Sequence, residues 1–324
     1  MGVKIIATGA YVPSYRVSNT DLECLLDTTD EWIQQRTGII SRHISQGENT
    51  SDLGYYAAKM AIEQANIDVA KIDFIIVATM SADYNTPSTA CLIQEKLDAN
   101  NAFACDINAA CSGFVYALHI ARSLMDYSTN GYGLVIGSEV MSKLLNWNDR
   151  STAILFGDGA GCVLLEKSVK SNLLSHVLHS DGEKGLSLCA VENPVCNPFV
   201  DNEKEVLPFL RMNGRDIFNF STRQIPTLIL ETVEKAECTL DDIDYFLIHQ
   251  ANLRIIELVA KKLDVPLDKF PTNVEHYGNT SSASIPILLD ELIQQRKIVL
   301  NGECTILMAG FGGGLTWGAL LIRI

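Results

Sequence analysis

The apolar positions of this chain alternate between two patterns. The longest largely apolar run covers only residues 74–80, whereas Phe114, Leu118, Ala121 and Met125 recur at spacings of four, three and four. The first pattern is typical of a strand buried on both faces and the second of a helix with one buried face. Apolar strands that alternate with helices indicate a parallel sheet covered by helices on both sides. The pattern therefore predicts an α/β fold.

The chain also repeats itself at an offset of 171 residues. Residues 61–79 (AIEQANIDVAKIDFIIVAT) match residues 232–250 (TVEKAECTLDDIDYFLIHQ) without a gap. Each copy is expected to form the end of a helix, an acidic turn and a buried strand. Strand-like segments follow in each half: 133–139 and 161–166 in the first, 304–312 and 318–324 in the second.

We therefore expect two similar halves, 1–168 and 169–324, packed as a pseudo-dimer, each closed by late antiparallel strands. A chance match remains the alternative for a single pair of segments. The stretch 180–210 lacks periodicity and contains three of the nine prolines, so we expect a mobile excursion from the fold there.

Composition excludes several classes of protein. The chain has 324 residues, 47% of them apolar, which excludes a disordered chain. A net charge of −14 opposes nucleic-acid binding, and the apolar runs are too short to cross a membrane. Nine cysteines without a C-x-x-C pair argue against a disulfide framework or a zinc site. We expect a cytoplasmic protein with no metal.

Cys111 is the cysteine best placed for chemistry. A predicted strand, 103–107, leads through small residues to the helix that contains Phe114. A thiol at the start of a helix faces free N–H groups, which favour the thiolate, and the small neighbours leave room for a substrate. The alternative is a buried structural cysteine.

Two polar residues of the second half are placed at comparable points. His249 follows a predicted strand, at the end where α/β sheets bind their ligands, although a core histidine is an equal alternative. Asn279 precedes a helix within GNTSSASIPILLDEL, and capping of that helix is its alternative role. His119 lies on the Cys111 helix without an obvious partner. Cysteine, histidine and asparagine provide a nucleophile and two hydrogen-bonding groups.

Two glycine-rich segments complete the candidate chemistry. FGDGAG (156–161) is followed by a strand and not a helix, so it fits neither a dinucleotide-binding nor a phosphate-binding loop. GFGGGLTWG (310–318) joins two predicted strands. It is either a tight connection or a backbone that presents N–H groups to an oxyanion.

Taken together, these motifs closely resemble the β-ketoacyl-acyl-carrier-protein synthase III family of the thiolase superfamily. The matching segments are DTTDEWIQQRTGI (27–39), DINAACSGF (106–114), DRSTAILFGDGA (149–160), HQAN (249–252), GNTSSAS (278–284) and FGGGLTWG (311–318). They occur in family order over nearly the whole chain. The resemblance implies a duplicated thiolase-like fold with α/β/α/β/α layers.

The resemblance also implies a reaction that starts fatty-acid synthesis. Cys111 would take an acyl group from acyl-coenzyme A, and the acyl-enzyme would condense with malonyl-acyl carrier protein as carbon dioxide leaves. His249 and Asn279 would hold the malonyl thioester oxygen, while the N–H groups of Cys111 and Gly313 would form the oxyanion hole for acyl transfer. No metal or redox cofactor is implied.

By the same resemblance, Trp32, Arg36 and Arg150 would hold the adenine and phosphate end of coenzyme A. Trp32 and Arg36 share one face of a predicted helix, and an ordinary surface contact is the alternative. The positions of the family that line the coenzyme A channel are also matched, by Thr28, Gly214 and Asn252.

Three further expectations concern partners and specificity. The family is expected to form homodimers, and Thr86 would shape the acyl pocket from across the dimer interface, where a small residue allows a longer or branched primer. Arg254, Lys261 and Lys262 would form a basic docking face for the acidic carrier, although a solvated helix face is the alternative. The stretch 189–207 is longer than the family pattern and has no assigned role.

Competing functions remain open at this stage. A related synthase could build a polyketide starter or a biotin-precursor chain. A cysteine hydrolase or simple acyltransferase would also use Cys111, and a non-enzymatic acyl-binding protein would need none of Cys111, His249 and Asn279.

Overall fold

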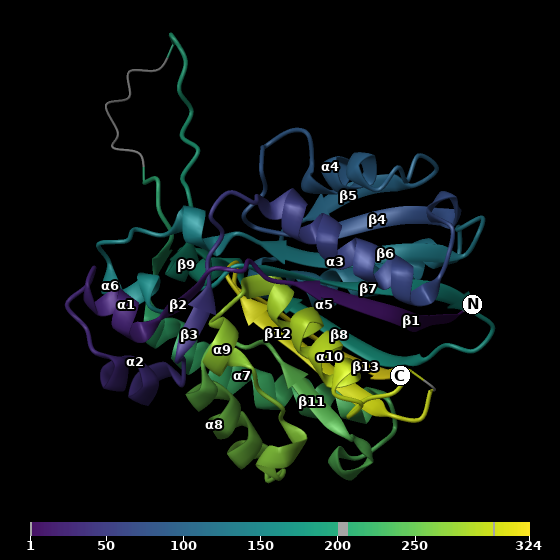
Figure 1. The fold of residues 1–324 in the computed structure, drawn as a ribbon. Coiled ribbons are helices and arrows are strands. Elements are labelled where there is room, and N and C mark those ends of the chain that lie inside the picture. The colour runs from purple at the N-terminus through teal and green to yellow at the C-terminus, as the bar shows by residue number, and fades with distance from the viewer. Residues whose placement is uncertain (1, 200–206, 301) are drawn as a thin grey trace.

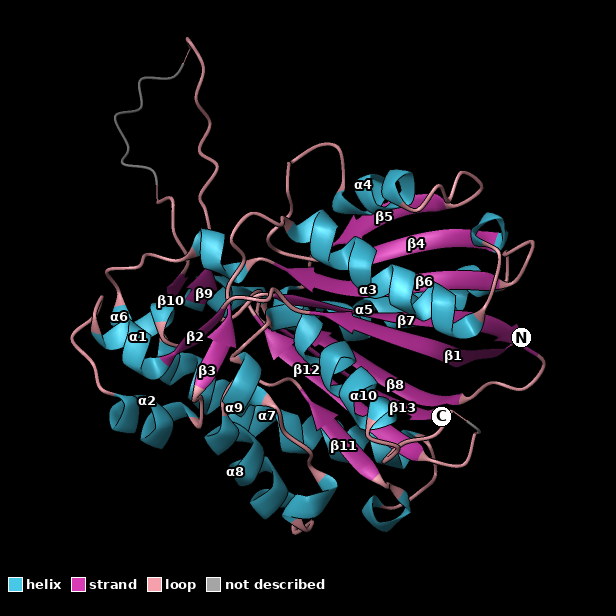
Figure 2. Ribbon diagram, viewed as in Figure 1, coloured by secondary structure: helices cyan, strands magenta, loops and turns pink. Residues whose placement is uncertain are grey.

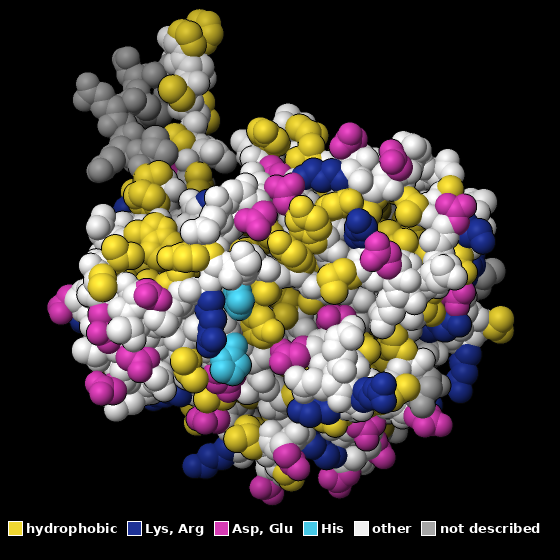
Figure 3. All heavy atoms as spheres, viewed as in Figure 1, with side chains coloured by type: hydrophobic (Ala, Val, Ile, Leu, Met, Phe, Trp, Pro, Cys, Tyr) yellow, Lys and Arg dark blue, Asp and Glu magenta, His cyan; other side chains and the backbone are white. Residues whose placement is uncertain are grey.

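Two β-sheets alternate with three layers of helices, as Figures 1 and 2 show. This architecture comes from a computed structural model, which describes residues 2–199, 207–300 and 302–324. The first sheet is built from residues 2–168 and the second from residues 173–323. In the space-filling view, acidic and basic side chains are interspersed over the visible face (Figure 3).

The first sheet has the strand order β1-β7-β6-β4-β5 within the described ranges. Its members are β1 (Gly2–Tyr11), β4 (Ile72–Ala78), β5 (Phe103–Ile107), β6 (Tyr132–Glu139) and β7 (Gly159–Ser168). β4 runs parallel to β5 and β6, whereas β7 runs antiparallel to β1 and β6. The expected late antiparallel pair is confirmed for β6 with β7, although β6 also pairs in parallel with β4. A helical crossover separates β6 from β5 and returns the chain in the direction of β4.

The second sheet repeats most of this arrangement, with the order β11-β12-β13-β8 among the described residues. Its members are β8 (Leu173–Ser180), β11 (Tyr245–Ile248), β12 (Thr305–Gly312) and β13 (Thr316–Arg323). β11 and β12 are parallel, and the other pairs are antiparallel. Both copies of the sequence repeat form the predicted helix, 3₁₀ turn and strand: α3 (Thr50–Ala65), η1 (Val69–Lys71) and β4, then α7 (Gly214–Lys235), η5 (Leu240–Asp242) and β11.

Helices cover the outer faces of both sheets and fill the space between them. α3 and α4 (Thr89–Lys96) pack outside the first sheet, and α7 and α8 (Leu253–Leu263) outside the second. α5 (Gly113–Met125) and α10 (Ser284–Gln294) lie between the sheets (Figure 1). The four apolar residues that predicted the α5 face are all buried in this middle layer. The α/β/α/β/α arrangement of a duplicated thiolase-like fold is thereby confirmed.

Short elements gather at one end of the sheets (Figure 1). They are β2 (Arg16–Ser18), α1 (Asn19–Glu23), α2 (Asp30–Thr37), β3 (Ser41–His43), α6 (Arg150–Ala153), β9 (Leu188–Cys189), β10 (Arg211–Met212) and α9 (Val274–Tyr277). Between β9 and β10, residues 190–199 extend away from the body (Figure 1). Residues 200–206, which also belong to the expected excursion, lie outside the described residues.

Candidate active site

Cys111 lies at the point where the chain turns from β5 into α5. It is the middle residue of a 3₁₀ turn, η2 (Ala110–Ser112), and is 4% exposed. Ala110 has a φ of 45°, in the left-handed region that few non-glycine residues adopt. Strained backbone of this kind often positions a functional side chain.

The electrostatics of Cys111 differ from the expectation. Burial raises the pKa of its thiol to about 12, and the buried Glu139 carboxyl adds to this rise, while a hydrogen bond with the Ser281 side chain opposes it. The prediction of a favoured thiolate is therefore wrong. The helix proper begins only at Gly113, and removal of the sulfur from water outweighs the N–H groups nearby.

His249 follows β11, and its ring is fixed from two sides. The side chain is 1% exposed, its Nδ1 lies 2.7 Å from the Ser284 Oγ, and the Phe311 ring meets it edge-on at 5.1 Å between centroids. Burial lowers the pKa of His249 to about 3. The imidazole is therefore neutral at physiological pH.

Asn279 does not cap α10, because the N-cap position of α10 is Ala283, which makes no side-chain capping bond. The Asn279 Oδ1 instead accepts the Ser281 N–H at 2.8 Å. Its backbone donates to the Leu155 carbonyl at 2.8 Å and accepts the Gly157 N–H at 3.1 Å, which joins the second half to the first.

Cys111, His249 and Asn279 line one cavity of about 330 Å³. Apolar side chains, including Phe156, Leu188 and Ile217, form part of its wall and belong to a larger buried cluster. Cys111 comes from the first half and the two polar residues from the second. Convergence of these groups from distant parts of the chain indicates a reaction site.

Trp32 and Arg36 lie at the same cavity and confirm the predicted shared helix face. The Arg36 guanidinium lies 5.6 Å from the centre of the Trp32 ring, and the Arg150 guanidinium lies 5.1 Å from it. Arg150 also donates to the Asp27 carbonyl at 2.6 Å. Two cations on one indole make a flat, positively charged surface that suits an anionic aromatic ligand.

Comparison with known proteins now decides the family. Family models described as 3-oxoacyl-[acyl-carrier-protein (ACP)] synthase III and as its C-terminal part match residues 105–182 and 233–324. A β-ketoacyl-[acyl-carrier-protein] synthase III of Streptococcus mutans is 50% identical over 321 residues, which are 99% of both chains. The chain belongs to the 3-oxoacyl-[acyl-carrier-protein] synthase III family.

Solved structures agree with this placement. The 3-oxoacyl-[acyl-carrier-protein] synthase III of Aquifex aeolicus VF5 superimposes with a TM-score of 0.91 at 42% identity, over 100% of both chains. The priming β-ketosynthase of the R1128 polyketide pathway gives a TM-score of 0.92 at 34% identity, over 100% of this chain and 96% of that one. The higher identities are to proteins named acyl-carrier-protein synthase III. The chain is thus an acyl-transferring condensing enzyme that initiates fatty-acid synthesis, and a polyketide-starter role is not favoured.

Of the remaining positions that match the synthase III family, two line the cavity and two lie outside it. Gly214 and Asn252 line it, although the Asn252 side chain also accepts the Arg254 N–H and donates to the Arg36 carbonyl. Thr28 does not line it, but its buried Oγ1 has no hydrogen-bond partner among the described residues. Thr86 is exposed on the loop between β4 and α4 and lies outside the cavity of its own chain.

In the loop 310–318, Gly312 lies closer to Cys111 than Gly313 does. A methyl group on Gly312 would lie 2.8 Å from the Cys111 N, whereas one on Gly313 would meet the Leu188 carbonyl and the Ala110 Cβ. The predicted connection between two strands is confirmed, because the loop joins β12 to β13.

Sequence reasoning missed Glu139, which is fully buried behind Cys111 at the end of β6. Its carboxyl accepts hydrogen bonds from side chains and backbone at the end of β4 and from η7 (Ser281–Ala283): the donors are Thr79, Met80, Ser81, Ser281 and Ser282. Burial raises the pKa of Glu139. A single acidic residue after an apolar strand gives no sequence sign of this network.

The three residues predicted from the synthase III resemblance to dock the carrier differ in their contacts. Arg254 is exposed, lines the cavity and lies 5.9 Å from the centre of the Phe218 ring, and Lys261 is exposed on α8. The Lys262 Nζ donates to the Thr222 carbonyl at 2.8 Å, so it is tied to α7. The mouth of the cavity thus carries Arg254 directly.

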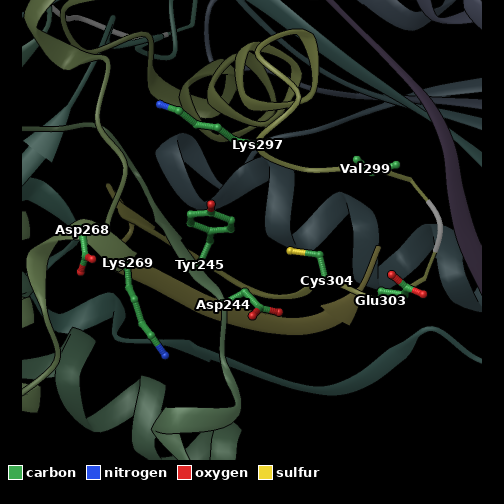
Figure 4. Close-up of a pocket in the computed structure, with 8 residues that line it drawn as sticks. All are labelled: Asp244, Tyr245, Asp268, Lys269, Lys297, Val299, Glu303 and Cys304. Carbon is green, nitrogen blue, oxygen red and sulfur yellow. The ribbon is translucent and has the colours of Figure 1, made fainter.

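The hollow in Figure 4 is not part of the candidate site. It lies where β11 and β12 begin, next to Asp244 and Cys304, and so at the opposite strand end from His249. Its Lys269 amine donates to the Asp241 and Ile243 carbonyls.

The described parts of the chain contain no helix with the length and apolar character needed to span a bilayer.

Proposed function

We propose that this synthase takes an acyl group from acyl-coenzyme A onto Cys111 and condenses it with malonyl-acyl carrier protein. The observation that carries the proposal is the convergence of Cys111, His249 and Asn279 on one cavity with an aromatic, cationic mouth. The names of the relatives, which specify an acyl-carrier-protein substrate, support it. We propose a cytoplasmic location as well.

In the first half-reaction, the Cys111 sulfur attacks the thioester carbonyl of acyl-coenzyme A. The new C–S bond replaces the bond to coenzyme A, and the proton of the Cys111 thiol ends on the coenzyme A thiol, so that charge balances. The tetrahedral oxyanion would be held by the N–H groups of Cys111 and Gly313. The Trp32, Arg36 and Arg150 side chains would hold the adenine and phosphates of coenzyme A, with Thr28, Gly214 and Asn252 along the channel.

In the second half-reaction, the malonyl carboxylate leaves as carbon dioxide and its electron pair forms an enolate. The enolate carbon attacks the acyl-enzyme carbonyl, and the Cys111 sulfur departs and takes up a proton from solvent. His249 and Asn279 would donate hydrogen bonds to the oxygen on which the enolate charge develops. Loss of carbon dioxide drives the step, so the proposal requires no metal or redox cofactor.

The apolar wall around Phe156, Leu188 and Ile217 would receive the acyl chain. We further propose a homodimer that pairs through β5, the edge strand of the first sheet, on which Phe103 is 51% exposed. In such a dimer Thr86 of one subunit would reach the acyl pocket of the other. Arg254 and Lys261, with Lys262 in support, would receive the acidic carrier.

The test is intact-mass measurement after incubation with acetyl-, butyryl-, isobutyryl- and hexanoyl-coenzyme A, followed by addition of malonyl-acyl carrier protein. The expected result is one acyl adduct that disappears as β-ketoacyl-carrier protein forms. Release of free acid without the malonyl substrate would instead identify a hydrolase.

A further inference from the structure

His249 and Ser284 form a buried pair whose hydrogen-bond direction can be worked out. The His249 Nδ1 lies 2.7 Å from the Ser284 Oγ, and both residues are almost fully buried. The Ser284 Oγ also accepts the Gln250 N–H at 3.4 Å. Ser284 is the first residue of α10.

A serine hydroxyl has one proton to donate, and in a buried site that proton needs an acceptor. Among the described residues, the acceptor offered to the Ser284 hydroxyl is the His249 Nδ1. If Nδ1 carried the ring proton, two N–H groups would point at the Ser284 oxygen and its own proton would have no acceptor. The favourable arrangement has the hydroxyl donating to a bare Nδ1.

We propose that Ser284 is a positioning residue that fixes His249 as the Nε2–H tautomer, so that the ring offers an N–H and not a lone pair to the cavity. This inference rests on the proposed role of His249 in condensation. It makes His249 a hydrogen-bond donor from the outset and excludes it as the base that removes the Cys111 proton in the free enzyme.

The neighbouring amide is fixed in the same sense. The Asn279 Oδ1 accepts the Ser281 N–H, which leaves the Asn279 amide N–H groups for the cavity. Burial keeps the imidazole neutral, because it lowers the His249 pKa. Two preset neutral donors suit an oxygen that gains negative charge only during the reaction, since they need no proton transfer to act.

The experiment combines a spectroscopic and a kinetic readout on the full chain. Long-range ¹H–¹⁵N correlation of ¹⁵N-histidine-labelled protein without substrate reports the tautomer, and the His249→Gln variant assigns the His249 signal among the six histidines. Wild type is expected to show Nε2–H. Ser284→Ala is expected to show a mixture of tautomers. Ser284→Thr, which keeps the hydroxyl, should retain the wild-type tautomer.

The kinetic expectation is a selective loss. Ser284→Ala should lower condensation with malonyl-carrier protein by about ten- to a hundredfold, by analogy with the loss found when a metal-bound histidine loses its orienting partner. Acylation of Cys111 should change less than about threefold, because acylation does not use the Nε2–H. Ser175→Ala is the matched control, since it also removes a buried hydroxyl, but one on β8 that donates to the Thr232 carbonyl and has no contact with His249.

Several results would overturn the proposal. These are an Nδ1–H tautomer in wild type, a Ser284→Ala variant with unchanged tautomer and condensation rate, or equal loss of acylation and condensation in that variant. A wild type with the Nε2–H tautomer but no condensing activity would refute the proposed function and leave the tautomer assignment standing.

Discussion

Ala110 and Ser281 lie 171 residues apart and occupy the same conformation in the two halves of the molecule. Their φ angles are 45° and 51°, and each begins a 3₁₀ turn that leads into a helix of the middle layer. Their separation equals the offset of the sequence repeat. The first turn carries Cys111, the proposed nucleophile. The second carries Ser281 and Ser282, which donate hydrogen bonds to Glu139, and it follows Asn279. The same backbone conformation thus positions different functional side chains in each half.

Gly312→Ala should abolish most acylation while leaving the protein folded. The added methyl group would lie 2.8 Å from the Cys111 N and 2.9 Å from its Cβ, so the nucleophile must move. A displacement of about 1 Å at a reacting group can cost about a hundredfold in rate. Acylation is followed by intact mass, and thermal unfolding reports the fold. Gly47→Ala, where a methyl group meets nothing within 4 Å, is the control; normal acylation by Gly312→Ala would contradict the packing argument.

Cys111→Ala should abolish the acyl adduct. The eight other thiols should remain unmodified, because of the nine cysteines, all of which lie among the described residues, only Cys111 lines the cavity with His249 and Asn279. Cys105 is a demanding comparison, since it is exposed. An adduct of full occupancy in Cys111→Ala would show that another thiol is the nucleophile.

His249→Ala and Asn279→Ala should each separate the two half-reactions. Loss of one donor to a developing oxyanion costs about 10²–10³ in rate, so condensation should fall by that factor while acyl-enzyme still forms. Rapid-quench measurement of the acyl-enzyme and of β-ketoacyl product tests each step separately. An equal loss in both steps would assign these residues to acyl transfer as well.

His249 should also make stability depend on pH on the acidic side. Its pKa is lowered in the folded state to about 3 from 6.5, so the unfolded chain binds a proton that the folded protein excludes as the pH falls between these values. The stabilisation is present above pH 6.5 and is lost progressively below it. Between pH 7 and pH 5, wild type should lose about 2 kcal/mol more free energy of unfolding than His249→Gln. Urea unfolding at both pH values measures this, and parallel losses in the two proteins would argue that the histidine is not buried as described.

The pair Arg254→Glu and Lys261→Glu should weaken use of the carrier at low salt. Exposed charge pairs contribute about 0–1 kcal/mol each and are screened by salt, so the Michaelis constant for malonyl-carrier protein should rise by about tenfold at low salt and less at high salt. Lys262 is left unchanged because its amine is bonded to the Thr222 carbonyl. Lys59→Glu with Lys71→Glu on the opposite half is the control. If the double variant had the wild-type Michaelis constant at low salt, the docking site would lie elsewhere.

The sequence was sufficient for elements that local patterns determine. The repeat, the strand that ends at His249, and the buried face of α5 all depend on residues close in the chain, and the structure has them where expected. Family motifs then indicated which cysteine, histidine and asparagine to consider together.

Properties that depend on residues far apart in the chain could not be predicted from the sequence. The high pKa of Cys111 arises first from its burial and then from Glu139 of β6, and Gly312 of β12 packs directly against the residue. The Glu139 network joins three segments that no spacing rule connects. The capping role considered for Asn279 failed because its side chain binds Ser281 within its own turn.

The middle layer has a consequence for dissection of this enzyme. α5 belongs to the first half and α10 to the second, yet apolar side chains of both helices share one core with both sheets. A fragment that ended at residue 168 would carry Cys111 but would leave that core open to water. Chimeras with other members of the family should therefore exchange α5, α10 and the facing strands as a single block, because the boundary along the chain is not a boundary in the packing.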